Sequence, residues 1–387
     1  MFSGYFDLPW WGYALVALAL THVTIAGVTI FLHRHQAHRA LELGPLPSHF
    51  FRCWLWLTTG MITREWAAIH RKHHARCETP DDPHSPQVLG LPRVLFGGVF
   101  LYVSESHKRD TIARFGYGTP DDWLERRLYT PFHKFGILLL LGADLALFGL
   151  VPGALIWGAQ MVWIPFWAAG VINGVGHFWG YRNFACADAS TNIVPWGILI
   201  GGEELHNNHH AYASSARLSN KWYEFDIGWF YIRILEILGQ ARVKKIAPTL
   251  RFAPARPTID RDTVQAVITH RYDVLAKYLR SLQRLAGEEF ARLRLDAREG
   301  RRLKRLLRQD AVGLPEPMQA ALAALLAKSE RLTKVYAMRA ELEALWARST
   351  ATHEQLVAQL QDWIARAEAS GIRQLEELSL RLRRYAP

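Results

Sequence analysis

Residues 8–38 read LPWWGYALVALALTHVTIAGVTIFLHRHQAH, an apolar segment that ends in three histidines. Residues 8–32 contain no Asp, Glu, Lys or Arg, and about 20 apolar residues suffice for a helix to cross a bilayer. His33 and His38 lie at the end of this span. Because five residues at about 100° each do not return to one helix face, we expect the helix to unwind or bend between them. His35 points elsewhere on any regular helix, so we exclude it from a site shared by the other two.

Two further histidine clusters share the pattern H-x-x-H-H, at residues 70–74 and 206–210. Positions i, i+3 and i+4 lie on one face of a helix, so each cluster offers three imidazoles. With His33 and His38 this makes eight, whereas one zinc ion takes four ligands. We therefore expect two metal ions side by side, although imidazole suits iron, zinc, copper and nickel alike. The histidines of the two clusters are His70, His73, His74, His206, His209 and His210.

Acidic residues flank the second cluster and could orient its imidazole N–H groups from outside the metal site. The alternative for each of them is a solvated turn. Asn173 and His177 lie at the end of the last apolar segment, and their spacing of four residues places both side chains on one helix face. The acidic candidates are Glu65, Glu78, Asp81 and Asp82.

The remaining apolar stretches set the expected membrane topology. Residues 135–176 are long enough for two spans joined by a tight turn near Pro152-Gly153. Residues 47–63 contain Arg52, and a crossing there would put the first two clusters on opposite sides of the membrane, so we expect an embedded or interfacial helix. The basic residues of the cluster loops place the clusters in the cytoplasm by the positive-inside rule. These residues are Arg34, Arg39, Arg64, Arg71, Lys72 and Arg76.

Charge divides the chain near residue 240. Residues 1–240 hold 18 basic and 18 acidic residues, whereas residues 241–387 hold 28 and 17, which accounts for the whole net charge of +11. Residues 258–385 have amphipathic spacing that predicts four or five helices. Their basic run RRLKRLLR, at residues 301–308, either contacts anionic lipid headgroups or phosphates or is a solvated helix face. No nucleic-acid motif accompanies it. The expected fold is all-α: a membrane helical bundle with a cytoplasmic histidine-rich cap (1–240) and a soluble basic helical extension (241–387).

Histidine clusters H-x4-H, H-x-x-H-H and H-x-x-H-H at the ends of membrane spans resemble the integral-membrane fatty acid desaturase and hydroxylase superfamily. Three further patterns resemble its acyl-CoA delta-9 (stearoyl-CoA) desaturase branch, in particular the bacterial, pseudomonad type. The resemblance covers residues 10–240 and does not reach the basic tail. The patterns are Glu65-Trp66, Glu78-Thr79 with Asp82-Pro83-His84, and Asn173 with His177 and Gly180-Tyr181-Arg182.

The resemblance implies a di-iron centre with nine histidine ligands and one position that reaches the metal through water, Asn173. It implies that O2 and two electrons introduce a cis double bond between carbons 9 and 10 of a C16 or C18 acyl chain held in a kinked tunnel. The implied partners are an acyl-CoA or acyl-lipid substrate, membrane lipid, and a separate reductase or ferredoxin-like electron donor, with no nucleic acid. The implied location is the inner membrane, with the site facing the cytoplasm. The nine ligands are His33, His38, His70, His73, His74, His177, His206, His209 and His210.

Some alternatives stay open at this point. Animal members carry Arg-Asp before the second cluster, where they help to hold coenzyme A, but this chain has Ala68-Ile69, so the substrate could instead be a phospholipid acyl chain. The same metals could serve a fatty acid hydroxylase or an alkane monooxygenase, against which the Asn173/His177 pair argues. A metal transporter would bind inside its spans, and a ferritin-like fold needs paired Glu-x-x-His motifs, of which only one occurs.

Overall fold

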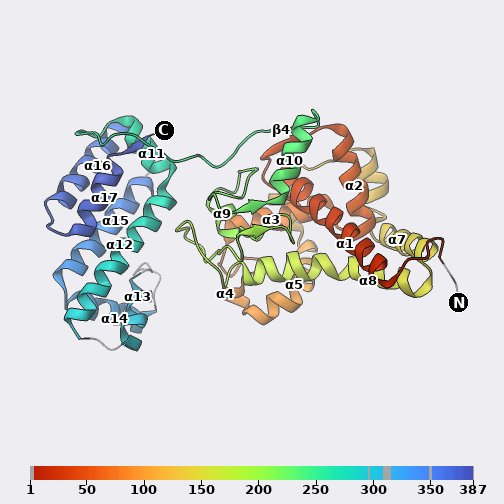
Figure 1. The fold of residues 1–387 in the computed structure, drawn as a ribbon, viewed down its shortest axis with the longest axis horizontal. Coiled ribbons are helices and arrows are strands. Elements are labelled where there is room, and N and C mark those ends of the chain that lie inside the picture. Colours follow the sequence, from red (N-terminus) through yellow and green to blue (C-terminus); the bar gives the residue numbers. More distant parts are fainter. Residues whose placement is uncertain (1–3, 295–296, 308–314, 348–350, 387) are drawn as a thin grey trace. The chain divides into compact units, whose positions relative to one another are not determined.

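A computed structural model describes residues 4–294, 297–307, 315–347 and 351–386. It divides into two compact units, residues 1–247 and 248–387, each considered by itself (Figure 1). The first unit ends seven residues beyond the change in composition, because strand β4 (Ala241–Val243) pairs antiparallel with β1 (Leu41–Leu43) of the same unit.

The first unit is mainly helical, with two short strand pairs. Strand β2 (Trp196–Gly197) pairs in parallel with β3 (Phe225–Asp226), so the expected all-α fold carries small β elements. Its helices are α1 (Trp10–Ala26), η1 (Gly27–Ala37), α2 (Pro45–Thr59), α3 (Thr63–Arg76), α4 (Pro86–Leu89), α5 (Leu91–Ser106), α6 (Arg109–Phe115), η2 (Glu125–Tyr129), α7 (His133–Phe148), α8 (Leu150–Ile164), η3 (Pro165–Val175), α9 (His206–Ala211) and α10 (Ile227–Ile237).

Among the described residues, two helices are long and apolar enough to cross a membrane, Trp10–Ala37 and Leu150–Val175. The preceding apolar helix α7 has only 16 residues, which is shorter than the roughly 20 residues of a typical span. The turn between α7 and α8 lies at Gly149, where φ is +86°, and not at Pro152-Gly153 as expected. Pro152 instead occupies the first turn of α8, where its missing N–H costs no helical hydrogen bond.

The first long helix changes its winding before it reaches the histidines. From Gly27 to Ala37 it is a π-helix, and the His38 N–H donates to the His33 carbonyl at 3.0 Å, a bond that spans five residues. The wider turn brings residues i and i+5 to one face, so the two rings lie 4.8 Å apart. The helix therefore widens between these histidines, where the sequence suggested that it unwinds or bends. The second long helix also ends in a π-helical stretch, η3.

Arg34 anchors this helix from the inside. Its guanidinium is 1% exposed and donates to the carbonyls of Ala216 and Gly201 and to the carboxylate of Asp226, at 2.9–3.0 Å. A buried arginine is tolerated when its charge is paired, and here the two terminal nitrogens make these contacts, whereas Nε has no hydrogen-bond partner among the described residues. Arg34 thus ties η1 to the segment that carries the third histidine cluster, and is no free charge at a membrane surface.

Arg71 has the same role between the first and second clusters. Its guanidinium donates to the carbonyls of Gln36 and Ala37 at the end of η1 and to those of Phe115 and Tyr117 after α6. These four carbonyls lie at or just after the ends of η1 and α6, where backbone carbonyls lack hydrogen-bond partners within the helix. The arginine between two histidines of α3 therefore fixes the helix that presents them.

The second unit is a helical bundle with its own core, built around Tyr278, Leu282, Leu285, Trp363 and Ile364. Strand β5 (Arg251–Phe252) pairs antiparallel with β6 (Tyr385–Ala386) and so joins the two ends of the unit. The described residues form seven helices, more than the four or five expected. One of the additional breaks lies between α11 and α12 at the buried His270, where no Gly or Pro marks it in the sequence. The seven are α11 (Arg261–Thr269), α12 (Arg271–Arg292), α13 (Ala297–Leu306), α14 (Glu316–Leu326), α15 (Glu330–Ala347), α16 (His353–Glu368) and α17 (Arg373–Leu382).

Candidate metal centre

The first unit brings nine histidines together in two adjacent groups. In each group the nearest ring nitrogens all lie within 4.8 Å of one another. Each H-x-x-H-H cluster is divided between the groups, so helices α3 and α9 face each other across both. One group is His33, His38, His70, His74 and His209, and the other is His73, His177, His206 and His210.

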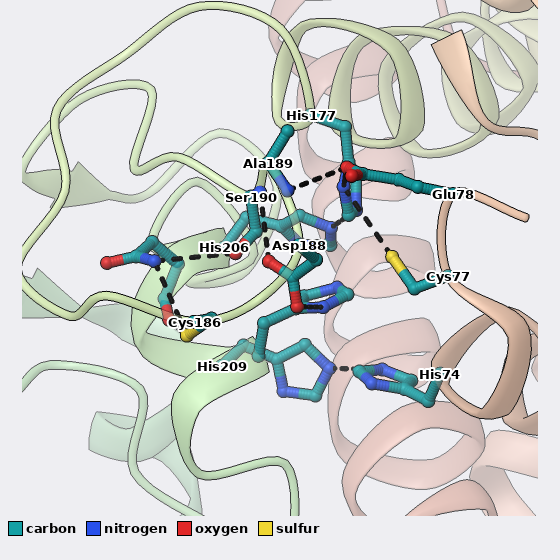
Figure 2. Close-up of polar contacts among 12 residues, drawn as sticks. His74, Cys77, Glu78, His177, Cys186, Asp188, Ala189, Ser190, His206 and His209 are labelled. Carbon is teal, nitrogen blue, oxygen red and sulfur yellow. Dashed lines mark hydrogen bonds and ion pairs between the residues drawn. The ribbon is translucent and has the colours of Figure 1, made fainter. Parts of the chain in front are cut away.

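Carboxylates set the tautomer of two rings in the second group. The Nδ1–H of His73 donates to Asp82 at 3.0 Å. The Nδ1–H of His177 donates to Glu78 at 3.3 Å (Figure 2). The turn that carries both acids is itself held in place, because the Glu78 N–H donates to the second Asp82 oxygen at 2.8 Å and the Ala189 N–H donates to Glu78. A neutral imidazole carries one proton, so Nε2 of each ring bears a lone pair.

Two acids that were not among the candidates from the sequence approach two other rings. Nδ1 of His210 forms a hydrogen bond of 3.1 Å with Asp188. Nδ1 of His33 lies 2.8 Å from Glu203 in an electrostatic contact, without a hydrogen bond among the described residues. Asp188 sits in a loop far from any cluster in sequence, so no local pattern could reveal it. Glu203 precedes His206 by three residues, a spacing we weighed only as a ferritin-like motif.

The unprotonated ring nitrogens converge. Nε2 of His177 lies 3.2 Å from Nε2 of His73 and 2.9 Å from that of His206. Since His73 and His177 both present lone pairs, these atoms repel unless a cation lies between them. Ligands at right angles around a metal, each about 2.1 Å from it, are about 3.0 Å apart. Nε2 of His210 is buried and has no hydrogen-bond partner among the described residues. The donor set therefore fits a pair of metal ions.

The electrostatic environment keeps these rings neutral, which is the form that binds metal. Burial holds the pKa of six of the imidazoles well below the usual value, and repulsion from neighbouring rings acts in the same direction. These six are His38, His70, His74, His206, His209 and His210.

The residues between the histidines of the third cluster hold α9 in position. Asn207 and Asn208 are 0% and 1% exposed. Asn208 accepts hydrogen bonds from the side chains of Asn183 and Asn192 and donates to Glu224. A short helix of six residues has little stability of its own, so this network fixes the direction of its three imidazoles.

The other predicted site residues lie at different places. Asp81 is exposed in the turn, and Glu65 lines a cavity and has no hydrogen bond to an imidazole among the described contacts. Asn173 lines the same cavity, as does His206. His35 lies outside both groups, with Nδ1 3.0 Å from the Leu41 carbonyl oxygen.

The cavity has a volume of about 470 Å³ and reaches the rings of His33, His70 and His206. Cavities that bind small molecules span roughly 300–1,000 Å³ and are mostly apolar. Among its polar lining residues are Ser106, His107, His133 and Lys134. Apolar lining comes from Val28, Met61, Ile69, Val99, Ile164 and Ile172.

Comparison with known proteins identifies the class. The family model for fatty acid desaturases matches residues 8–227, more than half of the chain. The chain therefore belongs to the fatty acid desaturase family and is a membrane fatty acid desaturase. The resemblance seen in the histidine clusters is confirmed at this level.

Individual relatives show the same relationship. The chain is 31% identical over 242 residues to an sn-1 stearoyl-lipid 9-desaturase of Anabaena variabilis, which covers 61% of this chain and 85% of the relative. It is 32% identical to delta-9 acyl-lipid desaturase 1 of Arabidopsis thaliana, covering 61% and 76% of the two chains. It is 29% identical to an acyl-CoA 5-desaturase of Anemone leveillei, covering 63% and 75%. The names of these relatives differ in both double-bond position and acyl carrier.

The C-terminal unit has a separate similarity. Residues 259–387 match a family model described as transposase. This match covers a third of the chain and lies wholly within the second unit. The amphipathic spacing of this segment is common to many helical bundles and therefore indicates no particular family.

Proposed function

We propose that this protein introduces a cis double bond at carbon 9 of saturated C16 and C18 acyl chains, using O2 and two electrons. The observation that carries the proposal is the convergence of two groups of histidines at the wall of an apolar cavity. Two iron ions would be held by the nine grouped histidines, with Asn173 acting through water. When bound, they supply the oxidising power that an unactivated methylene requires.

The chain's own residues bind and orient the substrate. Apolar side chains of α3, α5, α8 and η3 surround the acyl chain and exclude water, which protects a reactive site. The carboxylates of Asp82, Glu78 and Asp188 keep each paired imidazole in one tautomer and one orientation. Serine, histidine and lysine side chains of the cavity lining would lie near the polar end of the substrate.

Acyl-CoA is the substrate form we propose, and an acyl chain esterified to a lipid is the second candidate. The name of the relative from Anemone leveillei favours the CoA form. The names of the relatives from Anabaena variabilis and Arabidopsis thaliana favour the lipid form, as does Ala68-Ile69 in place of Arg-Asp. The site would face the cytoplasm, and the electrons would come from a separate reductase or ferredoxin-like protein.

The decisive test is product analysis with both substrate forms. The purified chain in nanodiscs, with iron, a ferredoxin and its reductase, receives stearoyl-CoA or stearoyl phosphatidylcholine. Gas chromatography with mass spectrometry should detect oleate from one of the two. A hydroxylated fatty acid or a double bond at another carbon would contradict the proposal.

Two neighbouring acids provide a matched test of the orienting carboxylates. Asp82→Asn removes the negative charge of the carboxylate that accepts a hydrogen bond from the His73 Nδ1–H. This change should weaken iron affinity or activity about 10- to 100-fold. Asp81→Asn changes the next residue, which is exposed, and should leave both unchanged. Chelator competition measures the affinity. If the two variants have the same iron affinity and the same activity, Asp82 does not orient the ring.

A further inference from the structure

The second unit contains a cavity that the desaturase reaction does not use. Its volume is about 890 Å³, and it lies among α12, α13, α17 and strand β5. Cationic side chains dominate its lining, where Glu377 is the one carboxylate among the described residues. The cationic residues are Lys277, Arg280, Arg284, Lys304, Arg381 and Arg384.

The fold gathers these charges from distant parts of the unit. Lys277, Arg280 and Arg284 are spaced by three and four residues along α12 and therefore share one face. Arg381 and Arg384 come from the end of α17 and the turn after it. The geometry of the chain, and not a local run of basic residues, builds the cluster.

Lys304 enters the cavity from α13. A Cβ atom on Gly287 of α12 would lie 3.2 Å from its ammonium nitrogen, so the absence of a side chain there leaves room for the lysine. Among the described basic side chains of residues 301–304, Lys304 lines the cavity, whereas Arg301 and Arg302 are exposed outside it.

Among the described residues, one carboxylate forms an ion pair with the arginines that line this cavity. Glu377 lies 3.4 Å from Arg284 but also 3.8 Å from Arg373, which lies outside the cavity. The guanidinium carbons of Arg381 and Arg384 lie 4.7 and 5.7 Å from the centre of one ring, that of Phe252. Nε of Arg381 is buried and has no hydrogen-bond partner among the described residues. Like charges held this close repel each other, so a bound anion would stabilise the arrangement.

We propose that this cavity binds a small molecule carrying at least two phosphate groups. Arginine presents planar donors that match phosphate oxygens, and several of them together suit a polyvalent anion. The volume lies within the range of small-molecule sites. A nucleic acid is a poorer fit, because it is bound through phosphates spaced along an extended surface, whereas these cations surround one hollow.

A phosphorylated metabolite and a lipid headgroup share this chemistry, and the experiment separates them. The full chain in phosphatidylcholine nanodiscs is titrated calorimetrically with pyrophosphate and with ADP. The titration is repeated in nanodiscs that also contain cardiolipin, whose headgroup carries two phosphates. Saturable binding in both discs indicates a soluble ligand, whereas binding that is lost in cardiolipin discs indicates the headgroup; either result supports a diphosphate site.

Charge-reversal variants test the location. Arg280→Glu with Arg384→Glu should weaken pyrophosphate binding at least about tenfold, since charge-assisted hydrogen bonds are lost. The control is Arg301→Glu with Arg302→Glu, which makes the same change of charge outside the cavity and should weaken binding only slightly. All altered side chains are exposed, and circular dichroism together with desaturase activity checks that each variant is intact. Arg280→Gln with Arg384→Gln provides a milder version in case charge reversal disturbs folding.

Three results would overturn the proposal. Equal weakening in the cavity variant and the control would indicate general electrostatic attraction. There is no site if two results are found together. Neither pyrophosphate nor ADP binds saturably in phosphatidylcholine discs, and cardiolipin does not change the thermal unfolding of the second unit. Tight binding of a DNA duplex that pyrophosphate cannot displace would indicate a nucleic-acid surface instead.

Discussion

His73→Ala is expected to abolish double-bond formation and to lower the iron content of the purified protein, while the protein stays in the membrane. His73 is 1% exposed, and its Nε2 faces that of His177 at 3.2 Å. Its Nδ1 is held by Asp82, so the ring cannot turn away. Removal of one ligand from a multihistidine site lowers the metal affinity and leaves the remaining ligands in a less precisely held geometry. We expect activity to fall by at least about two orders of magnitude.

The matched control is His35→Ala. His35 lies only two residues from His33, but its Nδ1 bonds the Leu41 carbonyl and its ring is outside both groups. This variant should keep its iron and most of its activity. Metal analysis by mass spectrometry and product analysis by gas chromatography are the measurements. Full activity of His73→Ala, or equal loss in both variants, would refute the proposed role of the histidine groups.

Arg34→Ala is expected to destabilise the first unit by about 3–5 kcal/mol, because it leaves the charge of Asp226 buried and uncompensated. Arg34 and Asp226 have side chains 1% and 0% exposed, and their atoms lie 2.9 Å apart. The same change removes two hydrogen bonds to the carbonyls of Ala216 and Gly201. Arg34→Lys should restore little of this stability, because lysine lacks the planar fork that reaches three acceptors.

Arg233→Ala is the control for this prediction. Arg233 also pairs with an acid, Glu236, but its side chain is 53% exposed, and exposed pairs contribute at most about 1 kcal/mol. Thermal unfolding in detergent, followed by circular dichroism, compares the variants. If both arginine variants unfold at the same temperature, Arg34 does not anchor the fold.

The sequence was a good guide wherever spacing along one helix carried the information. The H-x-x-H-H clusters predicted three imidazoles on one face, and α3 and α9 provide them. The resemblance to fatty acid desaturases is confirmed by the family match. Delta-9 specificity and the acyl carrier stay predictions, as do the assignments of individual ligands.

Residue spacing misled the prediction of backbone geometry where the helix type changes. His33 and His38 cannot share a face on an α-helix, and their spacing therefore predicted that the helix unwinds or bends between them. The π-helix from Gly27 to Ala37 solves the same problem by widening its turns. No composition rule predicts a π-helix, because its stability comes from packing and from the site that it serves.

Two features can be read from residue order alone: imidazoles recur at helical spacing beside apolar spans, and the charge balance changes near residue 240. Three others depend on the folded chain: each cluster is shared between two groups, Asp188 and Glu203 approach rings that are distant in sequence, and Arg34 and Arg71 are buried and hold separate segments together. The physical reason is that local spacing sets the face on which a side chain lies, whereas its partner comes from another segment of the chain. Such partners are recognised only when the chain has folded and the buried polar atoms can be matched to one another.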